Sequence, residues 1–126
     1  MELDIREIRD RGGKEERLFI KVLQDCNLND FIIYDETLDE EGNKSNIWPH
    51  MYRFDKWEVK KGEYVSLRVH KGKDKKGTLD DDKTVCYYLY WGFDDEVSIL
   101  NKSGDTVHLV RVNGETDLKI AAEEKA

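Results

Sequence analysis

The sequence has few of the residues that build disulfide scaffolds, metal sites or membrane spans. Two cysteines in 126 residues are too few for a disulfide framework. Cys26 and Cys86 lack metal-ligand spacing, so a reduced intracellular thiol pair is favoured over a disulfide. The first residues are charged, unlike a secretory signal, and no apolar run approaches the roughly 20 residues of a membrane span. We therefore expect a cytoplasmic protein with no membrane partner.

A helical pattern is also missing. No segment of eleven or more residues repeats its apolar positions with the 3.6-residue period of an amphipathic helix. Apolar and polar residues instead alternate in short runs that are separated by turn residues. The sequence therefore predicts an all-β fold with seven to eight short strands in a sandwich or barrel. Its length predicts one domain over residues 1–120, with a frayed tail at residues 121–126.

Six runs carry the clearest strand pattern. They cover residues 3–8, 16–24, 31–34, 64–69, 84–91 and 106–112. We expect residues 87–112 to form a core hairpin around a turn at residues 101–104. Asn113 and Gly114 predict a second tight turn, followed by a last strand at residues 116–120. Residues 71–83 are polar and contain glycine, so they are predicted to form a loop.

The run at residues 84–91 has two different faces. Val85, Tyr87, Leu89 and Trp91 alternate with Thr84, Tyr88 and Tyr90. Only one face can line a core, so the other presents rings to solvent, to a partner, or to a covering loop such as residues 35–46. Exposed tyrosine and tryptophan are enriched at protein interfaces. The candidate partner-binding residues are Tyr88, Tyr90, Trp57 and Trp48.

The charge balance bears on possible partners. Acidic residues outnumber basic ones by 28 to 21, and the formal net charge is −7. Nucleic-acid binding is driven by basic residues that neutralise phosphates, so this balance makes nucleic acid an unlikely partner. A local basic patch remains compatible with it. The alternative function is therefore a nucleic-acid-binding module that uses Lys71, Lys73, Lys75 and Lys76.

Acidic residues gather in several predicted loops. Carboxylate oxygens suit calcium, but none of these groups has the spacing of an EF-hand loop. A solvated acidic rim is the favoured interpretation. Weak calcium binding is the alternative if two of the groups lie at the same end of the fold. Its candidate ligands are Asp80, Asp81, Asp82, Asp94 and Asp95.

Catalytic motifs are not found. The sequence contains no nucleophile elbow and no phosphate-binding glycine loop. His50, His70 and His108 are far apart in sequence and match no zinc motif. We therefore expect a protein that is not an enzyme and holds no cofactor or metal. A small metal-dependent enzyme is the less favoured alternative.

Four segments, in order, carry a family resemblance. They read IREIRDRGGKEERLFIKVL, CNLNDFIIYDET, YRFDKWEVKKGEYVSLRVHKG and WGFDDEVSILNKSGDTVHLVRVNGE. Over residues 3–115 this order resembles the lamin-tail domain, and the last segment is the most similar. The resemblance implies an immunoglobulin-like two-sheet β-sandwich and a bacterial-type stand-alone member. It also implies a non-catalytic binding or adaptor module that engages a protein partner or self-associates.

Overall fold

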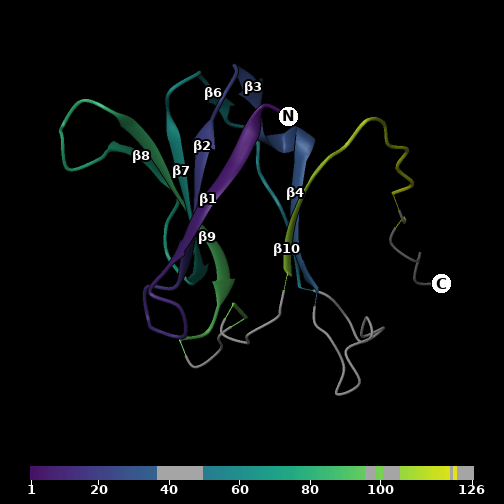
Figure 1. Ribbon diagram of the computed structural model, residues 1–126. Coiled ribbons are helices and arrows are strands. Elements are labelled where there is room, and N and C mark those ends of the chain that lie inside the picture. The colour runs from purple at the N-terminus through teal and green to yellow at the C-terminus, as the bar shows by residue number, and fades with distance from the viewer. Residues whose placement is uncertain (37–49, 96–98, 101–105, 120, 122–126) are drawn as a thin grey trace.

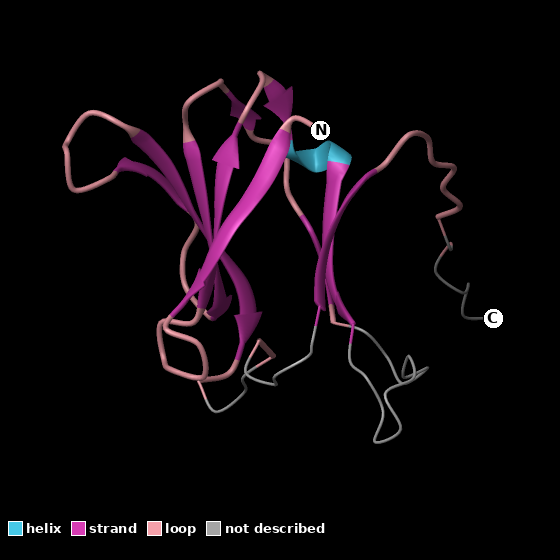
Figure 2. Cartoon of the chain, viewed as in Figure 1, coloured by secondary structure: helices cyan, strands magenta, loops and turns pink. Residues whose placement is uncertain are grey.

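The computed structural model describes residues 1–36, 50–95, 99–100, 106–119 and 121. Strands and loops make up this part of the chain, apart from one short 3-10 helix, η1 (Leu28–Asp30) (Figure 2). The described strands are β1 (Leu3–Arg9), β2 (Arg17–Val22), β3 (Cys26–Asn27), β4 (Phe31–Glu36), β5 (Met51–Arg53), β6 (Glu58–Val59), β7 (Tyr64–His70), β8 (Lys75–Thr78), β9 (Val85–Phe93) and β10 (Thr106–Arg111). The predicted all-β class is confirmed.

Two sheets face each other (Figure 1). The larger sheet has five strands in the order β1-β2-β7-β9-β8, and the smaller has three in the order β10-β4-β5. A short third sheet pairs β3 with β6. All described pairs are antiparallel except β7 and β9, which run parallel. β8 follows β7 in the chain but does not pair with it, because β9 lies between them in the sheet. β8 therefore forms the edge of the large sheet.

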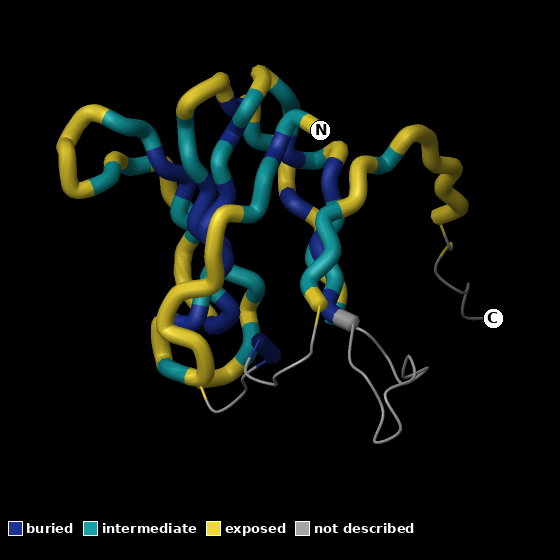
Figure 3. Tube along the Cα trace, viewed as in Figure 1, coloured by how far each residue is buried: buried dark blue, intermediate teal, exposed yellow. Residues whose placement is uncertain are grey.

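The core lies between the two large layers, as the buried positions in Figure 3 indicate. In β2, Leu18, Ile20 and Val22 point inward and are fully buried, as their alternation predicts. In β9, Tyr87 and Leu89 point the same way, whereas Tyr88 and Tyr90 are only half-buried. The predicted division of this strand into a core face and an opposite face is therefore confirmed.

A buried carboxylate ties the turn after β1 to a distant segment. Glu16 is fully buried. It accepts hydrogen bonds from the backbone N–H of Gly12 at 3.0 Å and of Ile99 at 3.3 Å. Buried carboxylates are tolerated only when such donors satisfy them. This carboxylate therefore links the turn after β1 to the segment at Ile99, which follows β9.

The predicted hairpin over residues 87–112 is wrong. β9 lies between β7 and β8, so both of its edges are already paired. β10 pairs with β4 in the other sheet instead, with Leu109 opposite Ile33. The connection therefore passes from one layer to the other. The predicted turn at residues 101–104 lies outside the described residues.

Two further predictions are corrected at the edges of the fold. Residues 71–83 were expected to form a loop, but they contain β8, which pairs with β9. The expected last strand is not formed by the described residues after β10, where Leu118 is 91% exposed. Leu118 finds no sheet to cover, because this segment leads away from both layers (Figure 1).

Candidate functional site

The candidate site is the outer face of the five-stranded sheet, which is the face turned away from the three-stranded sheet. Strand register brings its side chains into two neighbouring rows. One row runs through Phe19, Ser66 and Tyr88 on β2, β7 and β9. The other runs through Arg9, Arg17, Arg68 and Tyr90. Both rows cross several strands, so the sheet itself sets their spacing.

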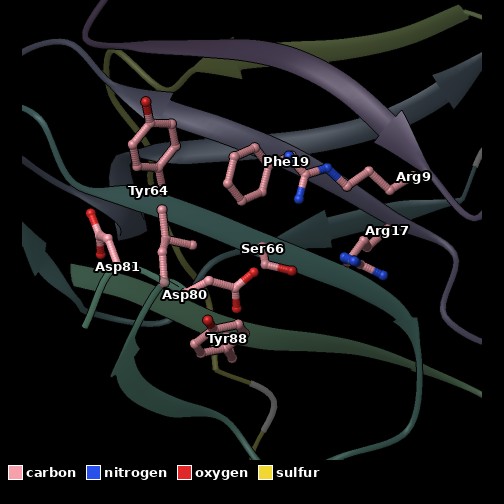
Figure 4. A pocket seen from close by; sticks show the side chains of 9 residues that line it. Arg9, Arg17, Phe19, Tyr64, Ser66, Asp80, Asp81 and Tyr88 are labelled. Carbon is pink, nitrogen blue, oxygen red and sulfur yellow. The ribbon is translucent and has the colours of Figure 1, made fainter. Parts of the chain in front are cut away.

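A groove of about 500 Å³ lies over the first row (Figure 4). Ser66 forms its floor, because a small side chain stands there between larger ones and is only 4% exposed. Phe19 and Tyr64 form one wall, where their rings stack at 5.0 Å between centroids. Tyr88 forms the opposite wall, and its hydroxyl donates to the backbone oxygen of Thr78 at 2.7 Å. The groove is therefore lined by aromatic rings that already have fixed positions.

Three arginines stand directly opposite one another beside the groove. The guanidinium of Arg9 lies 4.1 Å from the centre of the Phe19 ring and pairs with Glu7 at 2.6 Å. Arg68 pairs with Glu15 at 3.0 Å. Arg17, between them, donates to the backbone oxygen of Glu15 and makes no ion pair within the described residues. Like charges in directly opposed positions destabilise a sheet, and the carboxylates of Glu7 and Glu15 offset part of this cost for Arg9 and Arg68.

The other end of the groove is acidic. Both carboxylate oxygens of Asp81 accept hydrogen bonds within the turn before β9, and those from Thr84 and Lys83 lower its pKa. Asp81 therefore holds the turn. Asp80 instead directs its carboxylate into the groove, toward Ser66 and Tyr88 (Figure 4). The groove thus has a cationic end with Arg9 and Arg17, aromatic rings along its walls, and the carboxylates of Asp80 and Asp81 on its other side.

The groove continues along the sheet. A smaller depression of about 100 Å³ lies over Arg17, Ser66, Arg68 and the rings of Tyr88 and Tyr90. A third, of about 510 Å³, extends from Arg68 and these rings to β8. The ring of Tyr88 borders all three. We call these three depressions together the outer-face strip, and its form suits an elongated ligand.

The structure separates the predicted partner-binding residues. Tyr88 and Tyr90 lie together in the outer-face strip. Trp57 instead packs against the core, with its ring 5.6 Å from the ring of Tyr87. Trp48 lies outside the described residues. Of the three predicted residues that the structure describes, two therefore lie together and one packs on the other side of the sheet.

The predicted lysine group is also divided. Lys71 forms an ion pair with Asp94 at 2.6 Å, which raises its pKa. Lys75 and Lys76 extend over opposite faces of the sheet, 5.8 Å from the ring centre of Tyr88 and 5.7 Å from that of Tyr87. Lys73 is exposed in the preceding loop. Lys75 and Lys76 both line the third depression of the outer-face strip, whereas Lys71 and Lys73 do not, so the four lysines do not form one patch.

The predicted calcium ligands do not meet. Asp80, Asp81 and Asp82 precede β9, whereas Asp94 and Asp95 follow it. A strand of nine residues spans about 30 Å, so the two groups lie at opposite ends. Among the described residues, no group of three or more histidine, cysteine or acidic side chains is placed to hold a metal ion.

The histidines and cysteines have structural surroundings. The Nδ1 of His50 lies 2.9 Å from the carboxylate of buried Asp35, and the Nδ1 of His70 lies 2.8 Å from the backbone oxygen of Lys14. Cys26 and Cys86 are both free thiols. Burial raises the pKa of each from 9.0 to about 11, so both thiols stay protonated and poorly nucleophilic at neutral pH.

The sequence did not indicate the arginines of the outer-face strip or its stacked rings, Phe19 and Tyr64. Arg17 and Phe19 alternate with the inward-facing residues Leu18 and Ile20 of β2, and Tyr64, Ser66 and Arg68 alternate in the same way with the inward-facing residues of β7. That alternation was visible in the sequence. What was not visible is the order β2-β7-β9, which places these positions beside Tyr88 and Tyr90.

No family model, curated protein or solved structure matches this chain. Within the described residues, none of the helices is both long and apolar enough to cross a membrane. The geometry of the outer-face strip is therefore the main ground for assigning a function.

Proposed function

We propose that the protein is a non-catalytic binding module whose partner lies across the outer-face strip. The observation that carries this proposal is the row of three arginines beside half-buried aromatic rings, on a face that the core does not use. A purely structural outer face has no need of opposed like charges. Arginine and tyrosine are also the residues that most often dominate binding energy at interfaces.

The energetics are adequate for specific binding. Covering a large apolar side chain contributes roughly 1.5–3 kcal/mol before ordering costs are subtracted. Those costs are small here, because Phe19, Tyr64 and Tyr88 already hold fixed positions. The arginines add charge-assisted hydrogen bonds to an anionic partner. Phe19 is already buried and the tyrosine rings are half-buried, so each ring would contribute only the part of this value that belongs to its exposed surface.

We propose that the two facing sheets are an immunoglobulin-like sandwich of the lamin-tail type, because the order of sequence segments resembles that family over residues 3–115. A cytoplasmic location is proposed with it. The two free thiols support that location, since reducing compartments maintain unpaired cysteines.

The test is affinity capture from host lysate with wild-type protein, Arg17→Ala/Tyr88→Ala and Arg111→Ala. Arg111 is an exposed arginine on β10 of the other sheet, so it is the matched control. Captured material, protein or nucleic acid, should be lost with the double variant and kept with Arg111→Ala. Equal capture by all three proteins would contradict the proposal, and so would no specific capture at all.

A further inference from the structure

We infer that the partner of the outer-face strip is single-stranded nucleic acid, with phosphates on the arginine row and bases stacked on the half-buried rings of Tyr88 and Tyr90. This inference rests on the proposed function and goes further by naming the partner's chemistry. Of the lysine group considered above, it uses only Lys75. The three arginines, the rings of Tyr88 and Tyr90, and the carboxylate of Asp80 carry it.

Charge selects an anionic partner. Arg17 is flanked on neighbouring strands by Arg9 and Arg68, and within the described residues it has no carboxylate partner. Arginine binds phosphate through two parallel N–H groups, which suits it to a repeating phosphate backbone. The chain as a whole carries a charge of −7. A polyanion would therefore depend on local basic groups such as this row, because the chain as a whole repels it.

The aromatic rings select a partner with flat groups. Tyr88 and Tyr90 are two residues apart on β9 and lie on the same face, about 7 Å apart along the strand. Each also has a cation above its ring, with Lys75 at 5.8 Å and Arg68 at 5.7 Å. Rings beside a cationic track are the usual platform for single strands, because every base has a face that can stack.

The acidic end of the strip separates nucleic acid from an acidic peptide. Asp80 points into the groove (Figure 4), where it repels the carboxylates of a peptide and also any phosphate, so a strand must place a base and not a phosphate beside it. The same carboxylate accepts hydrogen bonds from the exocyclic amino group of a base, as acidic side chains do with cytosine. A free nucleotide would occupy only the first groove, whereas the three depressions are contiguous. The strip therefore fits a strand of several nucleotides.

The test is fluorescence anisotropy with a labelled single-stranded 12-mer of mixed sequence and an abasic 12-mer with the same number of phosphates. We expect the base-containing strand to bind at least tenfold more tightly. Three phosphate contacts predict a slope of about −2 for log K against log salt. Tyr88→Ala should weaken binding about 5- to 150-fold, and Arg17→Ala should make the slope shallower by about 0.7. Arg111→Ala should change neither quantity.

Other probes complete the test, with thermal melting to confirm that each variant is folded. An excess of mononucleotide should not displace the 12-mer, and a polyglutamate peptide should not bind. Equal binding of the abasic strand, or tighter binding of polyglutamate or mononucleotide, would overturn the inference. No binding of the 12-mer at low salt would also overturn it. In that case, the capture is repeated after nuclease treatment of the lysate. A protein partner whose capture then depends on Arg17 and Tyr88 would support the proposed function without the nucleic-acid inference.

Discussion

Tyr87 and Tyr88 are neighbours in β9, yet they serve opposite sides of the same sheet. Tyr87 is 2% exposed and its hydroxyl donates to the backbone oxygen of Glu58 and to the carboxylate of Glu63. Tyr88 is half-buried and borders all three depressions of the outer-face strip. The difference teaches that the inner face supplies stability, whereas the outer face keeps rings and charges in positions that stability does not require.

The largest effect is expected on the inner face. Leu67→Ala should reduce the free energy of unfolding by about 2–5 kcal/mol, because it removes a fully buried side chain and leaves a cavity. Tyr88→Ala is the outer-face control and should cost much less. Urea unfolding of both variants measures the difference. A cost for Tyr88→Ala equal to that of Leu67→Ala would erase the distinction between the faces.

Thiol reactivity tests whether the outer face of the sheet is covered at Cys86. Cys86 has outer-face register, opposite Tyr64 and Gly77, yet it is fully buried. Burial raises its pKa from 9.0 to about 11, which lowers its thiolate fraction at pH 8 about 100-fold. Alkylation of the Cys26→Ala variant against pH should show an apparent pKa near 11. A value near 9 would mean that the sheet is open at Cys86.

The raised pKa of Cys86 also makes the free energy of unfolding depend on pH. The folded thiol holds its proton more tightly than the unfolded thiol, so its contribution is fully present below pH 9. It is lost as the pH rises from about 9 to about 11. Cys86→Ala should make the fall in unfolding free energy over this window shallower. An unchanged slope would count against the buried environment of this thiol.

Two adjacent carboxylates give the next contrast. Glu16 is fully buried and accepts two backbone hydrogen bonds, whereas Glu15 is exposed and pairs with Arg68. Glu16→Ala should cost about 1–3 kcal/mol, because it leaves buried donors unsatisfied. Glu15→Ala should cost less than about 1 kcal/mol, as exposed ion pairs do. Chemical unfolding should show this order, and the reverse order would contradict the assigned roles.

The smallest expected effect is an increase in stability. Arg17→Gln should raise the unfolding free energy by about 0.2–1 kcal/mol, because Arg17 lies directly opposite two other arginines. The gain should shrink in 1 M salt, where exposed charges are screened. Arg6→Gln is the control, since Arg6 pairs with Asp4 and should show no gain. A loss of stability in Arg17→Gln at low salt would mean that the arginine row serves the fold.

Much of the fold followed from local alternation. The strands through Leu18, Val65 and Leu89 have the predicted faces, because side-chain direction depends only on position along a strand. The edge strand β8 was missed because its sequence, Lys-Lys-Gly-Thr, has no apolar alternation. Edge strands use lysine in this way to discourage pairing with other chains.

Pairing between distant strands was not available from local pattern. The alternation of β9 is the same whether its neighbour is parallel or antiparallel, so its parallel register with β7 carried no signal. The turn residues after β9 predicted that the chain reverses. They did not indicate that β10 would pair in the other sheet, with β4. For the same reason the sequence indicated Tyr88 and Tyr90 but not the arginines that lie beside them on β2 and β7.

The most direct test of the outer face is a map of amide chemical shifts as the ¹⁵N-labelled protein is titrated with the single-stranded 12-mer. The account predicts that the largest changes fall on β2, β7 and β9 around Arg17, Ser66 and Tyr88, and that the three-stranded sheet is unaffected. Changes centred on β4, β5 and β10, or changes of equal size on both sheets, would contradict it.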